Sequence, residues 1–316
     1  MNILCERLSI RYPIIQGGMG NISNAPLTAA VSEAGALGTI GAGTMEPDKI
    51  ENIIKDVKKT TKNPFCLNIP LSVQPYLTEV VKLVLKHQIP VVSLSAGNPA
   101  KFIKYFQENG IKVICVVATV KQALKAESLG ADVIVGEGYE AAGINSNFET
   151  TTLTLIPQLV NAVSIPVVAA GGIGDGRGLA AMLALGAQGV QMGTRFIATQ
   201  EALVHNDYKR LIVEADDTGT VVVGRTVGKI RRLLNTDYTQ KLISAEKEGT
   251  TLELFNELTD EDKHIAGAVH GNLEGGHLNS GQIAGIINDL PAVSELISRM
   301  MEEAKTACRN IQLNTK

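Results

Sequence analysis

The sequence is poor in the residue types that build disulfide frameworks and metal centres. Its 316 residues include no tryptophan and only four cysteines, with no CxxC pair among them. None of the five histidines stands at metal-ligand spacing from a cysteine. These absences argue against a disulfide-stapled domain and against a zinc site. We therefore expect buried free thiols, a reducing compartment and no bound metal.

Long apolar runs and a strong net charge are missing as well. No apolar run approaches the roughly 20 residues of a membrane span, and the N-terminal MNILCERLSI is too short and too charged for a signal peptide. A net charge of -3 gives no reason to expect nucleic acid or an anionic membrane as a partner. The sequence predicts a cytoplasmic protein that acts on small molecules, and it leaves a homodimer open.

What the chain does contain is a regular alternation of two patterns. Hydrophobic residues make up 45% of it and charged residues 19%, as in a well-cored globular protein. Apolar runs bounded by glycine, proline or polar turns alternate with segments of helical period. The runs lie at 13–16, 37–40, 65–69, 91–94, 113–117, 133–135, 167–170 and 190–192. Eight such units favour an α/β fold of the (β/α)8 TIM-barrel type over a doubly wound open sheet.

After Phe196 the pattern changes. We expect a barrel over residues 1–215, closed by a helix at 198–214, and a mostly helical C-terminal extension over 216–316 that packs over the barrel mouth. The extension holds a basic run, which we expect to be mainly solvated surface, with a docking face for an acidic or nucleotide partner as the alternative. Its members are Arg225, Lys229, Arg231 and Arg232.

The stretch 165–196 predicts a phosphate-binding site. An apolar run without polar alternation, typical of a buried parallel strand, leads directly into a glycine cluster. Four glycines fall within six residues: Gly171, Gly172, Gly174 and Gly176. Glycine leaves backbone N–H groups open to an anion, and the helix that follows directs its N-terminus to the same place. The next strand ends in a second small-residue turn at Gly193 and Thr194, whereas Arg177 stands where a dinucleotide fingerprint would need its third glycine.

The other predicted strand ends are rich in small residues and amides. They lack paired carboxylates, a Ser/His/Asp set and a metal cluster. Glycines would let a flat aromatic cofactor approach the backbone, and Gln16 and Asn68 would offer amide groups to its polar atoms. In such a site the protein orients the ring and the cofactor supplies the redox chemistry.

Seven motifs, in this order, resemble the FMN-dependent nitronate monooxygenase (2-nitropropane dioxygenase) family and its relative, enoyl-acyl-carrier-protein reductase II. They are QGGMG at 16–20, LN at 67–68, SAGNP at 95–99, GEGYEAAG at 136–143, AAGGIGDGRG at 169–178, QMGTRF at 191–196 and SGQIAG at 280–285. The resemblance covers almost the whole chain. It implies a (β/α)8 barrel that binds FMN, with NADH or NADPH as a co-substrate of the reductase reaction.

Carried over by matching position, the resemblance implies a set of FMN-binding residues. The set is Gly18, Met19, Asn68, Glu137, Ala141, Gly143, Ala170, Gly171, Gly172, Gln191, Met192, Gly193, Thr194 and Gln282. The family usually has a histidine directly after the glycine of the loop after the sixth strand, where this chain has Ile144. Isoleucine transfers no protons. The candidate catalytic positions are therefore Ile144, as the position of the family histidine, its neighbour Asn145 and the nearby Tyr139.

Four functions stay open on these grounds. The first is oxidation of a nitronate by O2, which needs no base because the substrate is already an anion. The second is NAD(P)H-dependent reduction of an enoyl thioester, with Tyr139 or water as proton source and acyl carrier protein docked on the basic run. The third is a barrel of the IMP dehydrogenase type, disfavoured because no cysteine lies between Cys115 and Cys308. The fourth is a flavin-binding protein of reduced activity.

Overall fold

The computed structural model describes residues 2–314, and its centre is a barrel of parallel strands. The sheet has eight strands in the order β1-β9-β8-β6-β5-β4-β3-β2. A parallel bridge between Ile15 and Leu37 joins the two edge strands, so the sheet closes on itself and the open doubly wound alternative is excluded. The strands are β1 (Ile14–Gln16), β2 (Gly38–Gly41), β3 (Phe65–Pro70), β4 (Val91–Ser95), β5 (Lys112–Val117), β6 (Val133–Glu137), β8 (Val167–Ala170) and β9 (Gly189–Met192).

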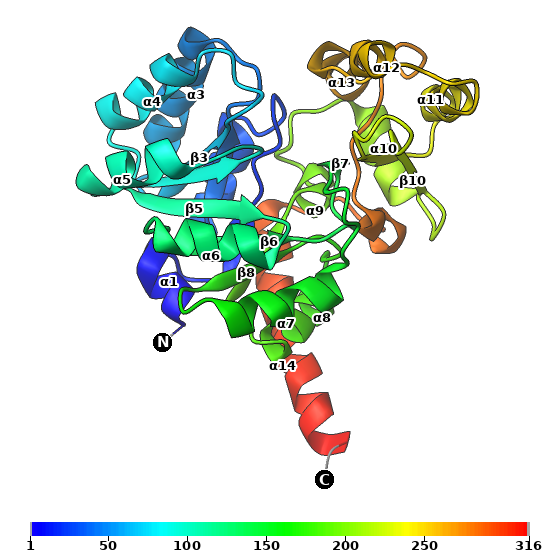
Figure 1. Ribbon diagram of the computed structural model, residues 1–316. Coiled ribbons are helices and arrows are strands. Elements are labelled where there is room, and N and C mark those ends of the chain that lie inside the picture. The colour runs from blue at the N-terminus through cyan, green and yellow to red at the C-terminus, as the bar shows by residue number, and fades with distance from the viewer. Residues whose placement is uncertain (1, 315–316) are drawn as a thin grey trace.

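A ring of helices covers the outer face of this barrel (Figure 1). Its members are α2 (Ala25–Glu33), α3 (Pro47–Thr60), α4 (Leu77–Lys86), α5 (Ala100–Glu108), α6 (Val120–Ser128), α7 (Thr152–Ala162) and α8 (Gly176–Ala184). Local sequence explains several of their starts. Proline occupies the first turn of α2 and α3, where no N–H partner is needed, and the side chain of Asp175 caps α8 by accepting from the N–H of Gly178.

Two hydrophobic layers hold the barrel together. The larger lies between the strands and the helical ring. The smaller fills the barrel interior, with side chains such as Cys66, Val91, Ile114 and Val168. The short helix α1 (Ile3–Leu8) adds Leu4 and Leu8 to this inner layer and so closes the bottom of the barrel. The opposite end, where the parallel strands terminate, stays open for a site.

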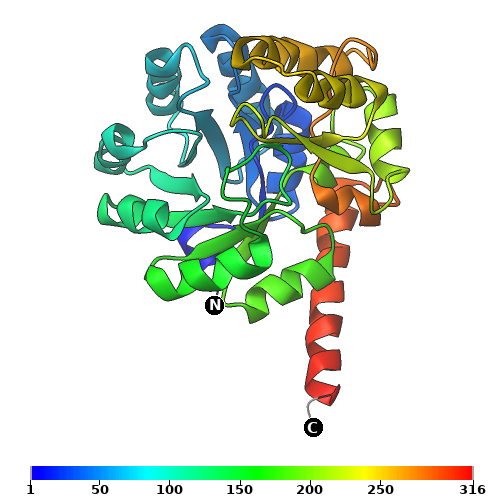
Figure 2. The ribbon, with the colours of Figure 1, turned by 45° about the vertical axis from the view of Figure 1, so that its right-hand side comes forward.

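The helix that completes the ring is the last one, which corrects one expectation. Helix α14 (Val293–Asn314) packs against α8 and α2, and its residues Val293, Leu296, Ile297 and Met300 belong to the outer core. The segment 198–214 instead contains a short lobe helix, α10 (Asn206–Val213), which packs against the segment η1 (Gln282–Ile286). Figures 1 and 2 show α14 along the side of the barrel, not over its mouth.

Between β9 and α14 the chain forms a lobe beside the barrel mouth (Figure 2). A three-stranded sheet joins β10 (Thr220–Val223), β11 (Arg231–Leu234) and β7 (Gly143–Ile144), so the lobe is tied to the loop after β6. Its remaining helices are α9 (Thr194–Ile197), α11 (Asp237–Lys247), α12 (Leu252–Leu258) and α13 (Glu261–Ala268). No helix within residues 2–314 is long and apolar enough to cross a membrane. Whether 1–215 and 216–316 are separate units stays a prediction.

Candidate active site

Two adjacent turns at the barrel mouth present backbone donors. Gly171 and Gly172 follow β8 with φ values of 101° and 71°, a left-handed conformation that favours glycine. Gly193 and Thr194 follow the neighbouring strand β9. Among the hydrogen bonds within residues 2–314, none uses the N–H group of any of these four residues as donor. Four open N–H groups from two neighbouring turns are suited to an anion such as a phosphate.

These turns surround a small cavity of about 150 Å³. Most of the predicted FMN-binding residues line it: Gly18, Met19, Asn68, Glu137, Ala141, Ala170, Gly171, Gly172, Gln191, Met192, Gly193 and Thr194. Gly281, from the lobe, lines it too, and its N–H donates to the Thr194 hydroxyl at 2.8 Å. Gln282 lies outside this lining, because its side chain is exposed and only its N–H donates, to the carbonyl of Glu140.

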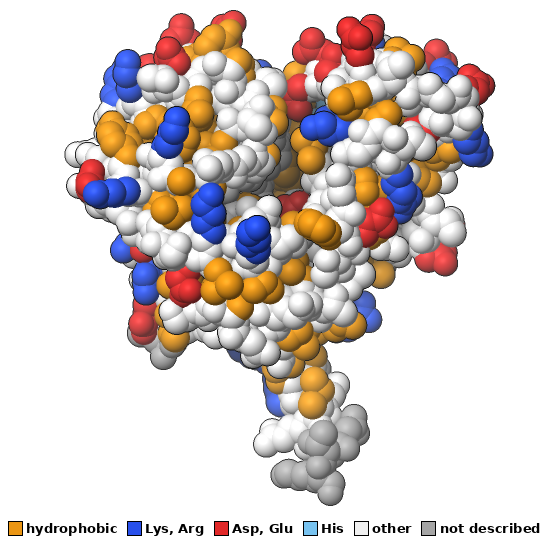
Figure 3. All heavy atoms as spheres, viewed as in Figure 1, with side chains coloured by type: hydrophobic (Ala, Val, Ile, Leu, Met, Phe, Trp, Pro, Cys, Tyr) orange, Lys and Arg blue, Asp and Glu red, His pale blue; other side chains and the backbone are white. Residues whose placement is uncertain are grey.

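A larger cavity of about 720 Å³ continues from the small one across the mouth, between barrel and lobe. Gly18, Met19, Asn68, Glu137 and Thr194 line both cavities, so the two cavities adjoin. Figure 3 shows the hollow between the barrel and the lobe. A small cavity with open N–H groups beside a space of this size is suited to a mononucleotide with a flat ring.

The two predicted amides have different roles. Asn68 donates to the hydroxyls of Ser93 and Ser95 at 3.3 and 3.1 Å, and it lines both cavities. Gln16 is fully buried, and its amide is satisfied by Ser23 and by the backbone of Thr39. Gln16 therefore fixes the turn after β1 and does not face a ring, contrary to expectation.

The three candidate catalytic residues lie in the loop after β6, but the loop does not bring them together in one place. Ile144 lines the large cavity with 52% of its surface exposed. Asn145 also lines it, but its amide nitrogen donates to the carbonyls of Ala141 and Gly143 and so holds the loop. Tyr139 lines neither cavity of the site: its ring lies between Arg225 and Arg232. The structure therefore does not support Tyr139 as a proton source at the mouth.

Glu137 is the carboxyl group of the barrel that faces both cavities. It stands at the end of β6, and within residues 2–314 its side chain has no hydrogen-bond partner. Burial raises the pKa of this carboxyl to about 7. A carboxyl group in this position exists in both protonation states near neutral pH.

The lobe adds residues to the large cavity that the sequence analysis did not assign to the site. They are Tyr208, Arg231, Glu261, His264 and Asn279. His264 stacks on His277 with ring centroids 5.3 Å apart, and burial lowers the pKa of both rings. Both ring nitrogens of His277 are buried without a partner among the described residues. Asn279 likewise has a buried side-chain oxygen without a partner.

The basic run is not one surface. Arg225 is exposed and pairs with Glu149 at 2.8 Å, whereas Arg232 is 5% exposed and donates to the Tyr139 carbonyl at 3.1 Å. Arg231 lines the large cavity instead. Successive residues of a strand point to opposite faces, which explains why two neighbouring arginines of β11 have different environments. The expectation of a solvated basic face is therefore wrong for Arg231 and Arg232.

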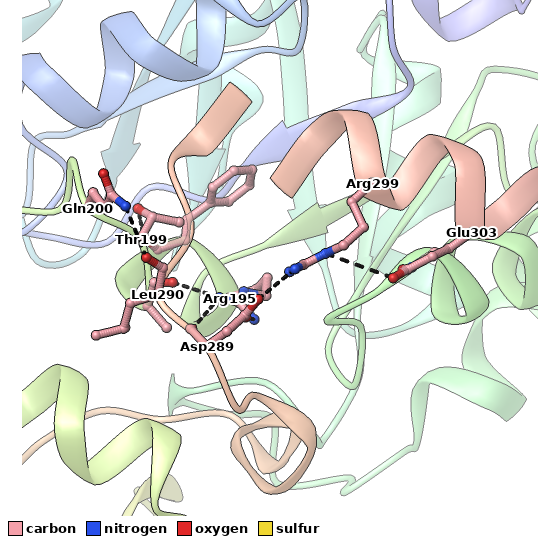
Figure 4. Close-up of polar contacts among 10 residues, drawn as sticks. Arg195, Thr199, Gln200, Asp289, Leu290, Arg299 and Glu303 are labelled. Carbon is pink, nitrogen blue, oxygen red and sulfur yellow. Dashed lines mark hydrogen bonds and ion pairs between the residues drawn. The ribbon is translucent and has the colours of Figure 1, made fainter. Parts of the chain in front are cut away.

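An ion pair between the buried Arg195 and the partly exposed Asp289 helps to fix the turn after β9 to the last helix (Figure 4). Arg195 directly follows Thr194 and is 3% exposed. Its guanidinium donates to Asp289 Oδ1 at 2.9 Å and to the Ala198 carbonyl at 2.6 Å. The second oxygen of Asp289 accepts from Arg299 of α14 at 2.6 Å. Helix α14 thus supports the turn at Gly193 and Thr194.

The fold and the site define a (β/α)8 barrel with open backbone N–H groups at its mouth and a lobe beside it. The family model described as nitronate monooxygenase matches residues 2–77 and 67–303, and the chain belongs to this family of FMN-dependent oxidoreductases. A probable nitronate monooxygenase of Staphylococcus haemolyticus (strain JCSC1435) is 34% identical, over 96% of this chain and 97% of that protein.

Two further relatives have other names. The structure of FabK from Thermotoga maritima superposes with a TM-score of 0.94 and 40% identity, over 99% of this chain and 98% of that one. A Mycobacterium tuberculosis (strain ATCC 25618 / H37Rv) protein named (3aS,4S,5R,7aS)-5-hydroxy-7a-methyl-1-oxo-octahydro-1H-indene-4-carboxyl-CoA dehydrogenase is 34% identical over 96% of both chains. Family membership therefore defines the enzyme class and leaves the substrate open.

Proposed function

We infer that this chain is an FMN-dependent oxidoreductase of the nitronate monooxygenase type, which oxidises nitronates with O2. The observation that supports this reaction most is Ile144 in the cavity wall, next to an Asn145 amide that is engaged with its own loop. Neutral nitroalkanes need a base within hydrogen-bond reach to lose their α-proton, and this loop offers none. A preformed nitronate needs no such base.

The residues present fit FMN. The open N–H groups of Gly171, Gly172, Gly193 and Thr194 would hold its phosphate. Asn68 would hold the part of the molecule that passes from the small cavity into the large one. When bound, FMN supplies the oxidation of the nitronate and the transfer of its electrons to O2. The chain's own part is to bind and orient both partners and to leave the substrate's charge intact.

An anaerobic stopped-flow experiment tests this function. The purified protein, with its flavin, is mixed with propionate 3-nitronate, NADH or NADPH in separate runs, and the flavin absorbance is followed. We expect the nitronate to bleach the flavin and the nicotinamides to leave it oxidised over the same time. A colourless protein that takes up no FMN, or a flavin that only nicotinamides bleach, would overturn the proposal.

The second candidate is the NAD(P)H-dependent reduction of an enoyl thioester, and the 40% identity with FabK favours it. Acyl carrier protein would then be the partner that presents the substrate. Rapid bleaching by NADH or NADPH, followed by reoxidation with an enoyl thioester, would support this reaction. The cytoplasmic location and a homodimer stay predictions.

A further inference from the structure

We propose that Arg231 is the anion-recognition residue of the large cavity and that it binds a planar group with two oxygens on one atom, as in a nitronate or a carboxylate. The proposal rests on the proposed function, because it names the charged group of the substrate in the same site. It also explains how a site with Ile144 in place of a histidine selects its substrate.

Arg231 stands directly beside Ile144. The antiparallel pairing of β11 with β7 sets Arg231 opposite Ile144 and Arg232 opposite Gly143. Side chains of directly opposed residues share one face of a sheet, with Cβ atoms about 5 Å apart. Arg231 and Ile144 both line the large cavity. A ligand that contacts position 144 is therefore within reach of the guanidinium.

The guanidinium of Arg231 has no partner in the part of the chain that the structure describes. Among residues 2–314, no hydrogen bond and no ion pair within 4.0 Å uses it. The other arginines of this region differ, because Arg225 pairs with Glu149 and Arg232 donates to Tyr139 and Thr220. A guanidinium has five N–H donors in a planar fork that matches two oxygens on one atom. An unpaired fork in a cavity wall is suited to such an anion.

Among the lobe residues that line the large cavity, Arg231 is the one that carries a positive charge. Burial lowers the pKa of Arg231, and the acidic residues Glu261 and Asp260 oppose this effect only in part. Glu261 is within hydrogen-bond reach of Asn21, at 2.8 Å, and forms no ion pair with Arg231. Lowered pKa values keep His264 and His277 neutral at pH 7. The other cation that lines the cavity is Lys125 of α6, which is exposed.

This arrangement selects substrates by charge. A nitronate is anionic before it enters and would gain two charge-assisted hydrogen bonds, whereas the parent nitroalkane is neutral and would gain weaker ones. The site would therefore favour the anion without removing a proton itself. The same reasoning applies to a carboxylate of similar shape, which can serve as a probe that does not react.

Equilibrium binding of butanoate and of neutral butanamide to the flavin-containing protein tests the proposal. We expect isothermal titration to show tighter binding of butanoate. Arg231→Gln should weaken butanoate binding about 10- to 100-fold and leave butanamide unchanged, and Arg231→Lys should lie between. Arg225→Gln is the matched control for loss of an arginine charge, and Lys125→Gln tests the other cation. Neither should change the affinity for butanoate more than about twofold.

Equal affinity of the wild type for the two probes, or of Arg231→Gln and the wild type for butanoate, would overturn the proposal. So would a loss in Lys125→Gln as large as that in Arg231→Gln. Thermal melts check that each variant folds. If Arg231→Gln does not fold, the affinity of Arg231→Lys for butanoate decides the test. Failure of the proposed function has a different result: butanoate binding depends on Arg231, yet nitronates leave the flavin oxidised. If the wild type and Arg231→Gln oxidise nitronates with the same KM, only the inference about Arg231 fails.

Discussion

Replacing Asp289 with asparagine should weaken the whole barrel, because the change leaves a buried guanidinium without its counter-ion. The side chain of Arg195 is 4% exposed and that of Asp289 is 35% exposed. Asp289→Asn keeps the size of the side chain and removes its charge. Arg195 would keep two backbone acceptors, the carbonyls of Ala198 and Asp289, but no anion.

The expected loss follows from the burial of the two groups. Removal of one partner from a fully buried ion pair costs about 3–5 kcal/mol. Asp289 is a third exposed, and Arg195 keeps two acceptors, so the lower end applies, discounted further to about 2–3 kcal/mol. Urea unfolding followed by circular dichroism measures it as a lower midpoint at an unchanged slope. Flavin affinity should fall as well, because Arg195 is the neighbour of Thr194.

The stability difference between wild type and Asp289→Asn should depend on pH in one direction. Burial would raise the pKa of Asp289, but Arg299 and Arg195 outweigh it and lower the pKa below the ordinary 3.8. A lowered pKa in the folded state stabilises the protein above that ordinary value and ceases to do so as the pH falls through the folded value. The gap between wild type and Asp289→Asn should therefore be constant near pH 7 and shrink below about pH 4.

An exposed ion pair of similar geometry is the control. Arg210 and Glu214 lie 2.7 Å apart, with side chains 50% and 56% exposed. Glu214→Gln should cost less than about 1 kcal/mol. A double-mutant cycle with Arg195→Met separates the pair from the fold: the double variant should be less destabilised than the sum of the single ones. If Asp289→Asn unfolds at the midpoint of Glu214→Gln, the reasoning from burial is refuted.

Three further predictions concern the mouth. A Cβ on Gly18 would stand 2.3 Å from the Cβ of Asn68, so Gly18→Ala should displace Asn68 and raise the FMN dissociation constant about tenfold or more, measured by fluorescence titration; an unchanged constant would contradict the placement of Asn68. Burial raises the pKa of Glu137 to about 7, so ionisation destabilises the folded state as the pH rises from 4.5 towards 7. The melting temperature of flavin-free wild type relative to Glu137→Gln should accordingly be higher at pH 5 than at pH 8, and a constant difference would argue against the raised pKa. Ile144→His should gain turnover of neutral nitroalkanes, measured as O2 uptake, and no gain would count against position 144 as the site of the missing base.

The barrel and the glycine turns at its mouth follow from local sequence, which is why they could be predicted; their binding of a phosphate stays a prediction. Buried parallel strands require uninterrupted apolar runs, such as 167–170, and these runs are visible without any partner. The left-handed turn at Gly171 and Gly172 requires glycine, and its place after a strand fixes its place at the mouth. Each of these features depends on residues within one β/α unit.

The helix that closes the ring could not be predicted in the same way. An amphipathic helix such as α14 specifies that one of its faces is buried, but not which surface buries it. Helix α14 reaches its place between α8 and α2 after the lobe has intervened, about 100 residues beyond β9. Its anchor is Asp289, which accepts from Arg299 of the helix and from Arg195, a residue distant in sequence.

The environments of single side chains in the lobe could not be predicted from local sequence either. Arg231 and Arg232 are adjacent, equally basic and in one strand, yet one faces the cavity and the other donates to Tyr139. Which of the two faces the cavity depends on the pairing of β11 with β7, and a shift of one residue would exchange them. That pairing is a tertiary contact between the lobe and the loop after β6. The charge that the cavity presents to a substrate is therefore set by strand register, and composition alone does not specify it.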